Sequence, residues 1–222
     1  MGPTPIMHLG IAGQVVPAIA WAVSRHRTRA ATALALGGAI GLGGDIVGRW
    51  MAHRFGNNHI TTYIDAPLMT VCFLAALREW QVTERERRAF AAGTLLFLLS
   101  CVGLVASVED IQTFNFGIGP LASLTLLAGA VWTLLRRTAA TEQLAIHRTD
   151  WFWGALGLAM QGGATALASP LGGVLLERGR LDLFTIAWEV RAILLVISYL
   201  LIGWGIYRGP AVSEERPLER GA

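Results

Sequence analysis

The chain has 222 residues, of which 54% are hydrophobic and only 15% are charged, and its net charge is +3. A soluble domain carries about 25% charged residues, so the composition excludes an ordinary soluble enzyme, and its hydrophobicity excludes a disordered chain. All 18 basic residues are arginine; without lysine, neither retinal nor pyridoxal can form a Schiff base with the chain. No basic run alternates with aromatic residues, as a nucleic-acid surface requires, so we expect no nucleic-acid partner.

Seven apolar stretches are long enough to cross a bilayer as helices, which takes about 20 residues each. They are predicted at residues 5–23, 31–53, 59–78, 89–107, 114–135, 151–170 and 183–206. Their connections are short, so consecutive helices should be antiparallel neighbours within the lipid bilayer. The sequence therefore predicts an all-α, polytopic membrane protein with a seven-helix transmembrane domain over residues 1–207. A flexible cytoplasmic tail is expected over residues 208–222.

Arginine is unevenly distributed over the connections between these spans. Thirteen of the 18 arginines lie in the connections after the first, third and fifth spans and in the tail. Four lie on the other side: Arg49, Arg54, Arg178 and Arg180. Because cytoplasmic loops carry the excess of positive charge, we expect the N-terminus outside and the C-terminus in the cytoplasm. The exclusive use of arginine is typical of GC-rich bacterial genomes, which favours the bacterial inner membrane.

Tryptophan, proline and capping residues mark further positions along the spans. Six tryptophans fall at the cytoplasmic span ends, where an aromatic belt is expected: Trp21, Trp80, Trp132, Trp151, Trp153 and Trp204. Three prolines lie within spans, and each is expected to remove one helix hydrogen bond: Pro17, Pro67 and Pro120. Three polar residues are expected to cap the fourth and fifth spans on the outer side: Glu109, Asp110 and Asn115.

Two segments of the chain match each other. Residues 35–44 correspond to residues 155–163 with one gap, through an Ala-Leu-Gly run followed by a Gly-Gly pair. Asp65 and Glu189 each precede a tryptophan at the end of their span by 15 residues. This pattern predicts a 3+1+3 parallel repeat, in which the fourth span joins two units of three helices, an arrangement that occurs in transporters. The alternative is a chance match, because alanine, leucine and glycine are abundant.

A stripe of glycines runs along the second span. Gly37 with Gly41, and Gly44 with Gly48, are small-xxx-small pairs, which let helix backbones approach closely. We predict that these glycines pack the second span against a neighbouring helix.

Ionisable residues inside the spans are the main indication of function. Such groups are costly in hydrocarbon, so they should face the bundle interior and be paired. With a rise of about 1.5 Å per residue, their depths fit two cross-helix ion pairs, Asp45 with Arg191 and Arg49 with Glu189, and leave Asp65 as an extra negative charge. The predicted ligand-binding residues are Asp45, Arg49, Tyr63, Asp65, Glu189 and Arg191.

Three kinds of function fit these residues. The first is an outward-facing charged cavity that binds or transports a small ligand or cation. The second is a metal-dependent membrane hydrolase acting on lipid, with His53 and His59 as metal ligands and His8, Asp45 and Asp65 as further donors. The third is an accessory subunit of a larger membrane complex, with a membrane protein as its partner. A network of salt bridges that only fixes helix register is the structural alternative, and no cofactor or catalytic residue can be assigned.

Residues 57–68, with the sequence NNHITTYIDAPL, resemble a segment of uncharacterised small bacterial seven-helix membrane proteins. In those proteins an Asn-rich loop leads into a span that carries aromatic and acidic residues. The resemblance implies a seven-helix membrane fold and no particular activity.

Overall fold

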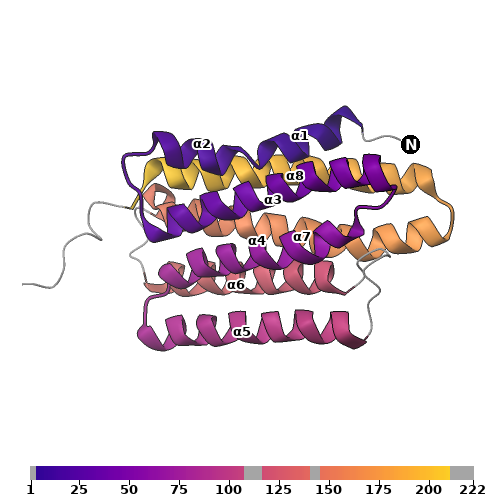
Figure 1. Ribbon diagram of the computed structural model, residues 1–222. Coiled ribbons are helices and arrows are strands. Elements are labelled where there is room, and N and C mark those ends of the chain that lie inside the picture. The colour runs from indigo at the N-terminus through magenta and orange to yellow at the C-terminus, as the bar shows by residue number, and fades with distance from the viewer. Residues whose placement is uncertain (1–3, 108–116, 141–145, 211–222) are drawn as a thin grey trace, which may run out of the picture.

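The computed structural model of the chain describes residues 4–107, 117–140 and 146–210. Over these ranges every regular element is a helix, which confirms the all-α prediction (Figure 1). The elements in chain order are α1 (Pro5–Gly13), α2 (Val16–Val23), α3 (Arg29–Phe55), α4 (His59–Glu79), α5 (Glu84–Ser107), α6 (Ile118–Ala140), the 3-10 helix η1 (Ile146–Arg148), α7 (Asp150–Glu177) and α8 (Leu181–Arg208). The predicted capping residues Glu109, Asp110 and Asn115, and the tail beyond residue 210, lie outside the described residues.

Six helical segments among the described residues are long and apolar enough to cross a membrane: the α1–α2 pair, α3, α4, α5, α6 and α8. α7 has 28 residues, which is sufficient length, but polar side chains such as Gln161 and Thr165 make it less apolar. Many of its residues are buried, among them Trp151 and Leu158, and a helix enclosed by protein needs fewer apolar residues than one that faces lipid. The helices therefore support a polytopic membrane protein, whereas the count of seven spans stays a prediction.

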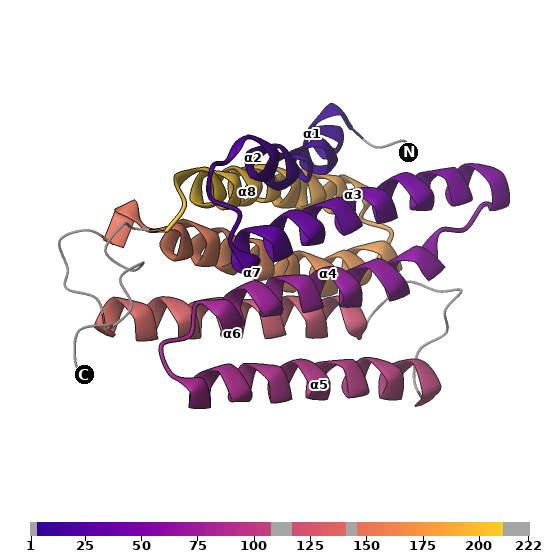
Figure 2. The same ribbon diagram turned by 60° about the vertical axis from the view of Figure 1, so that its left-hand side comes forward.

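The helices that enclose the centre of the molecule form a closed ring. α3 packs against α4, α4 against α6, α6 against α7 and α7 against α8. α8 packs against both α1 and α2, and α2 packs against α3, which completes the circle. We call α1–α2, α3, α4, α6, α7 and α8 the helix ring. α5 lies outside the ring and packs against α4 and α6, as Figure 2 shows.

The glycine stripe on α3 faces α4. A methyl group added at Gly37 would overlap the ring of Phe73, and one added at Gly44 would overlap the carboxylate of Asp65. A methyl group at Gly48 would lie 2.9 Å from a hydroxyl oxygen of α4. These contacts confirm that the stripe brings α3 and α4 close together, as small residues do in membrane helix pairs.

The first span is broken at its middle. α1 ends at Gly13 and α2 begins at Val16, so the chain makes a short interruption at Gln14. Pro17 lies in the first turn of α2, where its missing N–H and fixed φ are compatible with a helix start but not with continuation from α1. The sequence predicted one continuous span that loses a hydrogen bond at Pro17, whereas the structure divides this span into two helices. α4 continues through Pro67, and the prediction for Pro120 is wrong because that residue lies in the first turn of α6.

The helices alternate in direction, so the connections gather at two ends of the bundle (Figures 1 and 2). We call the end with the α2–α3 and α4–α5 connections the arginine-rich end, and the end with the α3–α4 and α7–α8 connections the opposite end. The described arginines in the terminal turns and connections of the arginine-rich end are Arg25, Arg27, Arg29, Arg78, Arg85, Arg87, Arg88, Arg136, Arg137, Arg148 and Arg208.

The tryptophans predicted as a belt lie at the arginine-rich end, but not all of them face outward. Trp132 and Trp204 are exposed, whereas Trp80 and Trp151 are buried. Trp80 packs directly over the backbone of Gly154, where a side chain would occupy the same space as the indole ring. The belt prediction is thus wrong for Trp80 and Trp151, because their helices offer room for the rings inside the bundle.

Candidate functional site

A cavity of about 380 Å³ lies within the helix ring, and every member of the ring contributes to its lining. It extends from the opposite end, at Asn58 and His59, to the middle of the bundle, at Gln14 and Thr70. The residues with polar atoms that line it are Gln14, Asp45, Asn58, His59, Thr62, Asp65, Thr70, Ser123, Gln161, Thr165, Ser169, Trp188, Arg191 and Tyr199. Small-ligand sites are concave and hold a few convergent polar groups; this cavity is concave and is richer in polar groups than most.

Asp45 on α3 is held by the break in the first span. Gln14, at the break, donates a hydrogen bond of 2.5 Å from Nε2 to Asp45 Oδ2. The amide of Gln14 can approach α3 because Gly41 has no side chain in the space that the amide oxygen occupies. Only the NH₂ group of an amide can donate to a carboxylate, so this bond fixes the amide orientation and directs Gln14 Oε1 away from Asp45.

Asp65 on α4 contributes a second carboxylate to the same cavity. Its side chain lies against Gly44 of α3, as described above for the glycine stripe. Within the part of the chain that the structure describes, no side chain donates a hydrogen bond to the Asp65 carboxylate. The charges of Asp45 and Asp65 repel each other, so the α3–α4 wall of the cavity is electrostatically negative when both are ionised.

Arg191 on α8 lies on another wall of the cavity. Its Nε donates a hydrogen bond of 3.4 Å to Thr165 Oγ1 on α7. Its guanidinium carbon lies 5.6 Å from the centroid of the Trp188 ring, within cation–π range. These two contacts position the guanidinium from α7 and α8 without neutralising its charge.

The two predicted ion pairs are not formed. Among the described residues, neither Asp45 with Arg191 nor Arg49 with Glu189 lies within the 4.0 Å distance of an ion pair. Asp45 is attracted to Arg191 through space, but Gln14 occupies the contact position on its carboxylate. The prediction was wrong because depth along a helix fixes only the height of a residue and not the direction in which its side chain points.

The other predicted site residues divide between the cavity and its surroundings. His59 lines the cavity, whereas Arg49, Tyr63, Glu189 and His53 do not. Arg49 is exposed at the opposite end, where its Nη1 lies 2.8 Å from His8 Nδ1. A step of four residues along a helix rotates a side chain by about 40°, which is enough to carry Arg49 from the face of Asp45 toward α1. His53 is exposed, and Tyr63 and Glu189 are half-buried.

Sequence analysis missed two amides on the cavity wall. Gln14 and Gln161 are only 7% and 4% exposed, and within the described part of the chain the buried Oε1 atom of each has no hydrogen-bond partner. Gln161 Nε2 donates to Tyr199 Oη at 3.3 Å, which links α7 to α8. The signal was available, because amides inside apolar spans are costly in the same way as ionisable groups.

No metal centre is evident in the described part of the chain, because no group of three or more His, Cys, Asp and Glu side chains converges there. The assignment of His53 and His59 as metal ligands therefore stays a prediction. His59 shares the cavity with Asp65, and His53 lies outside it.

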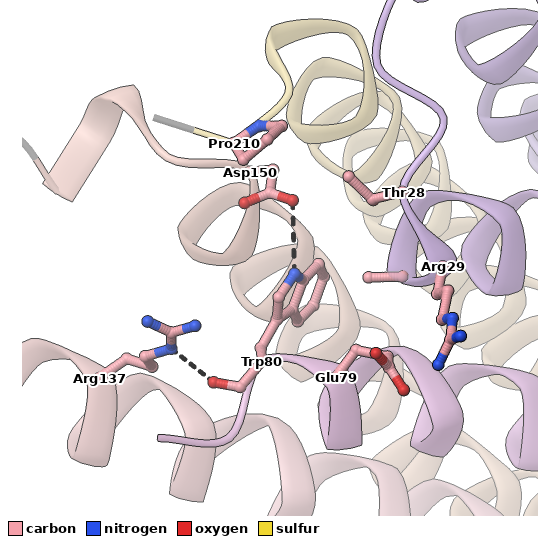
Figure 3. A pocket seen from close by; sticks show the side chains of 8 residues that line it. Thr28, Arg29, Glu79, Trp80, Arg137, Asp150 and Pro210 are labelled. Carbon is pink, nitrogen blue, oxygen red and sulfur yellow. Dashed lines mark hydrogen bonds between the residues drawn. The ribbon is translucent and has the colours of Figure 1, made fainter. Parts of the chain in front are cut away.

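A second hollow of about 450 Å³ lies at the arginine-rich end, between α3, α4, α6 and α7 (Figure 3). Two of its charged groups, Arg137 and Asp150, are engaged by the protein itself. Arg137 Nε donates to the backbone oxygen of Trp80 at 2.5 Å, and Trp80 Nε1 donates to Asp150 Oδ2 at 3.4 Å. Asp150 Oδ1 also accepts the N–H of Trp151 at 2.8 Å. These bonds tie α4, α6 and α7 together, so we interpret this hollow as structural.

No family model, no curated protein and no solved structure matches the chain. The resemblance of residues 57–68 to small bacterial seven-helix proteins stays a prediction.

Proposed function

We propose that the protein is a seven-helix membrane protein that binds a small ligand in the cavity of the helix ring and transports it. In this proposal α7 is the seventh span, the opposite end faces the outside of a bacterial inner membrane, and the arginine-rich end faces the cytoplasm. The arginine distribution supports the orientation through the positive-inside rule. The length of α7 and its place between α6 and α8, which it contacts along the ring, support its role as a span.

The observation that carries the proposal is the presence of three charged groups on one cavity without a direct ion pair among them. Asp45, Asp65 and Arg191 all line the cavity. A network that only fixes helix register would be expected to bring opposite charges into contact, because charges in hydrocarbon are costly unless paired. A polar ligand that enters the cavity supplies the missing partners, which favours a binding site over a structural network.

The arrangement of the helix ring supports transport. The first unit of the predicted repeat comprises α1–α2, α3 and α4, and the second comprises α6, α7 and α8. In the repeat, α1–α2 corresponds to α6, α3 to α7 and α4 to α8. The contact of α4 with α6 then corresponds to the contact of α8 with α1 and α2, so both junctions between the units are equivalent. The cavity lies between the units, where repeat-based transporters place their substrate sites.

Asp65→Asn tests the proposal, with Glu189→Gln as the matched control. Both substitutions remove one acidic charge inside a span, but only Asp65 lines the cavity. We expect native mass spectrometry of the gently solubilised protein to show a small bound mass in the unmodified protein and in Glu189→Gln. The same mass should be lost or much reduced in Asp65→Asn.

The outcomes separate the alternatives. A protein free of any bound small molecule in all three samples would contradict the binding proposal. A bound zinc ion would favour the metal-dependent hydrolase, and a co-purifying protein would favour the accessory subunit.

A further inference from the structure

The two carboxylates on the α3–α4 wall and two buried amide oxygens keep hydrogen-bond acceptor capacity that the described side chains do not use. Asp45 accepts one side-chain hydrogen bond, from Gln14, whereas Asp65 accepts hydrogen bonds only from the backbone N–H groups of Asp65 and Ala66 within the described residues. An ionised carboxylate has room for about four donors. Gln14 Oε1 and Gln161 Oε1 are two further buried acceptors, and neither has a hydrogen-bond partner among the described residues. Because none of these oxygens can donate when the carboxylates are ionised, the chemical group that satisfies them must supply N–H or O–H donors.

An ammonium group meets this requirement best. It has three donors and a positive charge, so it can form charge-assisted hydrogen bonds to the carboxylates that line the cavity. Its charge also relieves the repulsion between Asp45 and Asp65. A bare metal ion fits less well, since no group of three His, Cys, Asp and Glu side chains converges among the described residues.

Arg191, on the other wall, has a positive charge and N–H donors that an anionic group could bind. A guanidinium has five N–H donors, and among the described residues the only hydrogen bond that Arg191 donates is the one from Nε to Thr165 Oγ1. The fork formed by its two terminal nitrogens is therefore open. Such a fork matches the two oxygens of a carboxylate in a bidentate contact. Thr165 and Trp188 hold the guanidinium in place before a ligand arrives, which reduces the ordering required on binding.

The volume limits the size of the ligand. Ligand pockets commonly have volumes of about 300–1,000 Å³, and this cavity, at about 380 Å³, lies near the lower end of that range. A small molecule that carries both charges fits this volume, whereas a lipid or a peptide does not.

We infer that the ligand is a small zwitterionic amino acid, with its ammonium group at the α3–α4 wall beside Asp65 and its carboxylate on Arg191. This inference deepens the proposed function and rests on the cavity being a ligand site. The ligand class follows from the opposed charges on the two walls of the cavity.

The test compares three probes that share a four-carbon chain and differ in their charged groups: 4-aminobutanoate carries both, butylamine only the ammonium and butanoate only the carboxylate. Glycine and 6-aminohexanoate extend the panel to shorter and longer separations of the two charges. Binding of each probe to the purified full chain in detergent is measured by isothermal titration calorimetry, and thermal stabilisation provides an independent readout. We expect at least one amino acid to bind at least about tenfold more tightly than the matched amine and acid, which is the lower range for a charged hydrogen bond.

Variants of the two walls should show which wall recognises which charged group of the ligand. Arg191→Ala is expected to weaken amino-acid binding by about tenfold or more, while butylamine binding is unchanged. Asp65→Asn is expected to weaken both the amino acid and butylamine. Arg191→Lys keeps the charge but loses the fork, and should bind the amino acid with intermediate affinity; it also serves if Arg191→Ala does not fold. Glu189→Gln should bind every probe as the unmodified protein does.

The results distinguish failure of this inference from failure of the proposed function. If butylamine binds as tightly as the amino acids and Arg191→Ala changes nothing, the ligand is a simple cation, so the zwitterion inference is overturned and the cavity remains a binding site. If butanoate binds best, the inference is likewise overturned. If no probe binds but native mass spectrometry shows another small molecule, the ligand class is wrong and the proposed function stands. If no probe binds and no small molecule is present, both are overturned.

Discussion

The hydrogen bond between Gln14 and Asp45 joins the break in the first span to the wall of the cavity. Inside a membrane-spanning bundle, a carboxylate that loses its donor retains the cost of burial without compensation. Gln14 has no substitute among the described side chains, since it is the one side chain that donates to Asp45. The same amide also lines the cavity, so one residue connects the packing of the first span with the proposed ligand site.

Gln14→Leu should therefore destabilise the protein, by about 1–3 kcal/mol in the free energy of unfolding, because Asp45 is left without its side-chain donor. The double variant Gln14→Leu with Asp45→Leu should recover most of that loss, since replacing both polar partners by apolar groups is often close to neutral. Denaturation of the single and double variants in detergent measures both effects. If the double variant loses as much as the two single variants combined, the hydrogen bond does not couple the two residues.

At the scale of residues, the sequence predicted which side chains belong to the polar interior better than it predicted their partners. Asp45, Asp65, Arg191 and His59 were expected near one another and line one cavity. Their contacts were not predictable, because a contact between helices depends on the rotation of both helices about their axes, which one sequence does not fix. Gln14 was missed because the helix break that directs it inward arises from Pro17, three residues away.

α3 and α4 show how an element can serve packing and function with the same residues. The glycines of α3 create a groove, and the α4 side chains that fill it include Phe73 near one end and Asp65 beside the cavity. The position of Asp65 is thus set by the absence of a side chain at Gly44. The helices themselves were predictable, since the hydropathy pattern places each span within several residues of its observed bounds. α7 is less apolar than the other long helices, and many of its residues are buried against neighbouring helices and not exposed to lipid.

Gly43 and Gly44 are neighbours in sequence and offer a matched pair of substitutions. Gly44→Ala should cost about 1–3 kcal/mol of stability, because the added methyl group overlaps Asp65 and forces α4 away. It should also weaken ligand binding, since Asp65 moves. Gly43 has no atom within 4 Å of an added methyl group, so Gly43→Ala should stabilise the protein by about 0.5–1 kcal/mol through helix propensity.

Thermal denaturation and the probe-binding assay applied to both alanine variants compare these effects. Equal stability of the two variants would show that the glycine groove does not position α4.

At the scale of the whole molecule, the two ends of the ring differ. Hydrogen bonds join the helices at the arginine-rich end, and the cavity reaches the opposite end. At the arginine-rich end, Trp80 is bonded to both Arg137 and Asp150, which joins three helices (Figure 3). The cavity extends inward from the opposite end. In the proposed transporter, a ligand would enter from the opposite end, and movement of the two three-helix units against each other would have to break the Trp80 contacts to release it at the other side.

The orientation can be measured with single cysteines in a variant without Cys72 and Cys101. Arg54 and Arg27 are both exposed and lie at different ends of the bundle. In intact cells, we expect a membrane-impermeant thiol reagent to label Arg54→Cys and not Arg27→Cys, because positive-inside topology puts the arginine-rich end in the cytoplasm. After the membrane is permeabilised, both should react. Labelling of Arg27→Cys alone in intact cells would reverse the orientation and with it the direction from which the cavity is reached.

α5 contributes nothing to the lining of the cavity and packs on the ring from outside, yet the proposed topology depends on it. A unit of three spans ends on the membrane face opposite to the one where it began. A second unit joined directly to the first would be inserted upside down, and the two could not be related by a rotation about the membrane normal. One additional crossing restores the direction of insertion, and that crossing is α5. Two separate three-helix chains, each inserted on its own, would assemble the same ring without it, so α5 solves a problem of biogenesis that arises only when both units are translated as one polypeptide.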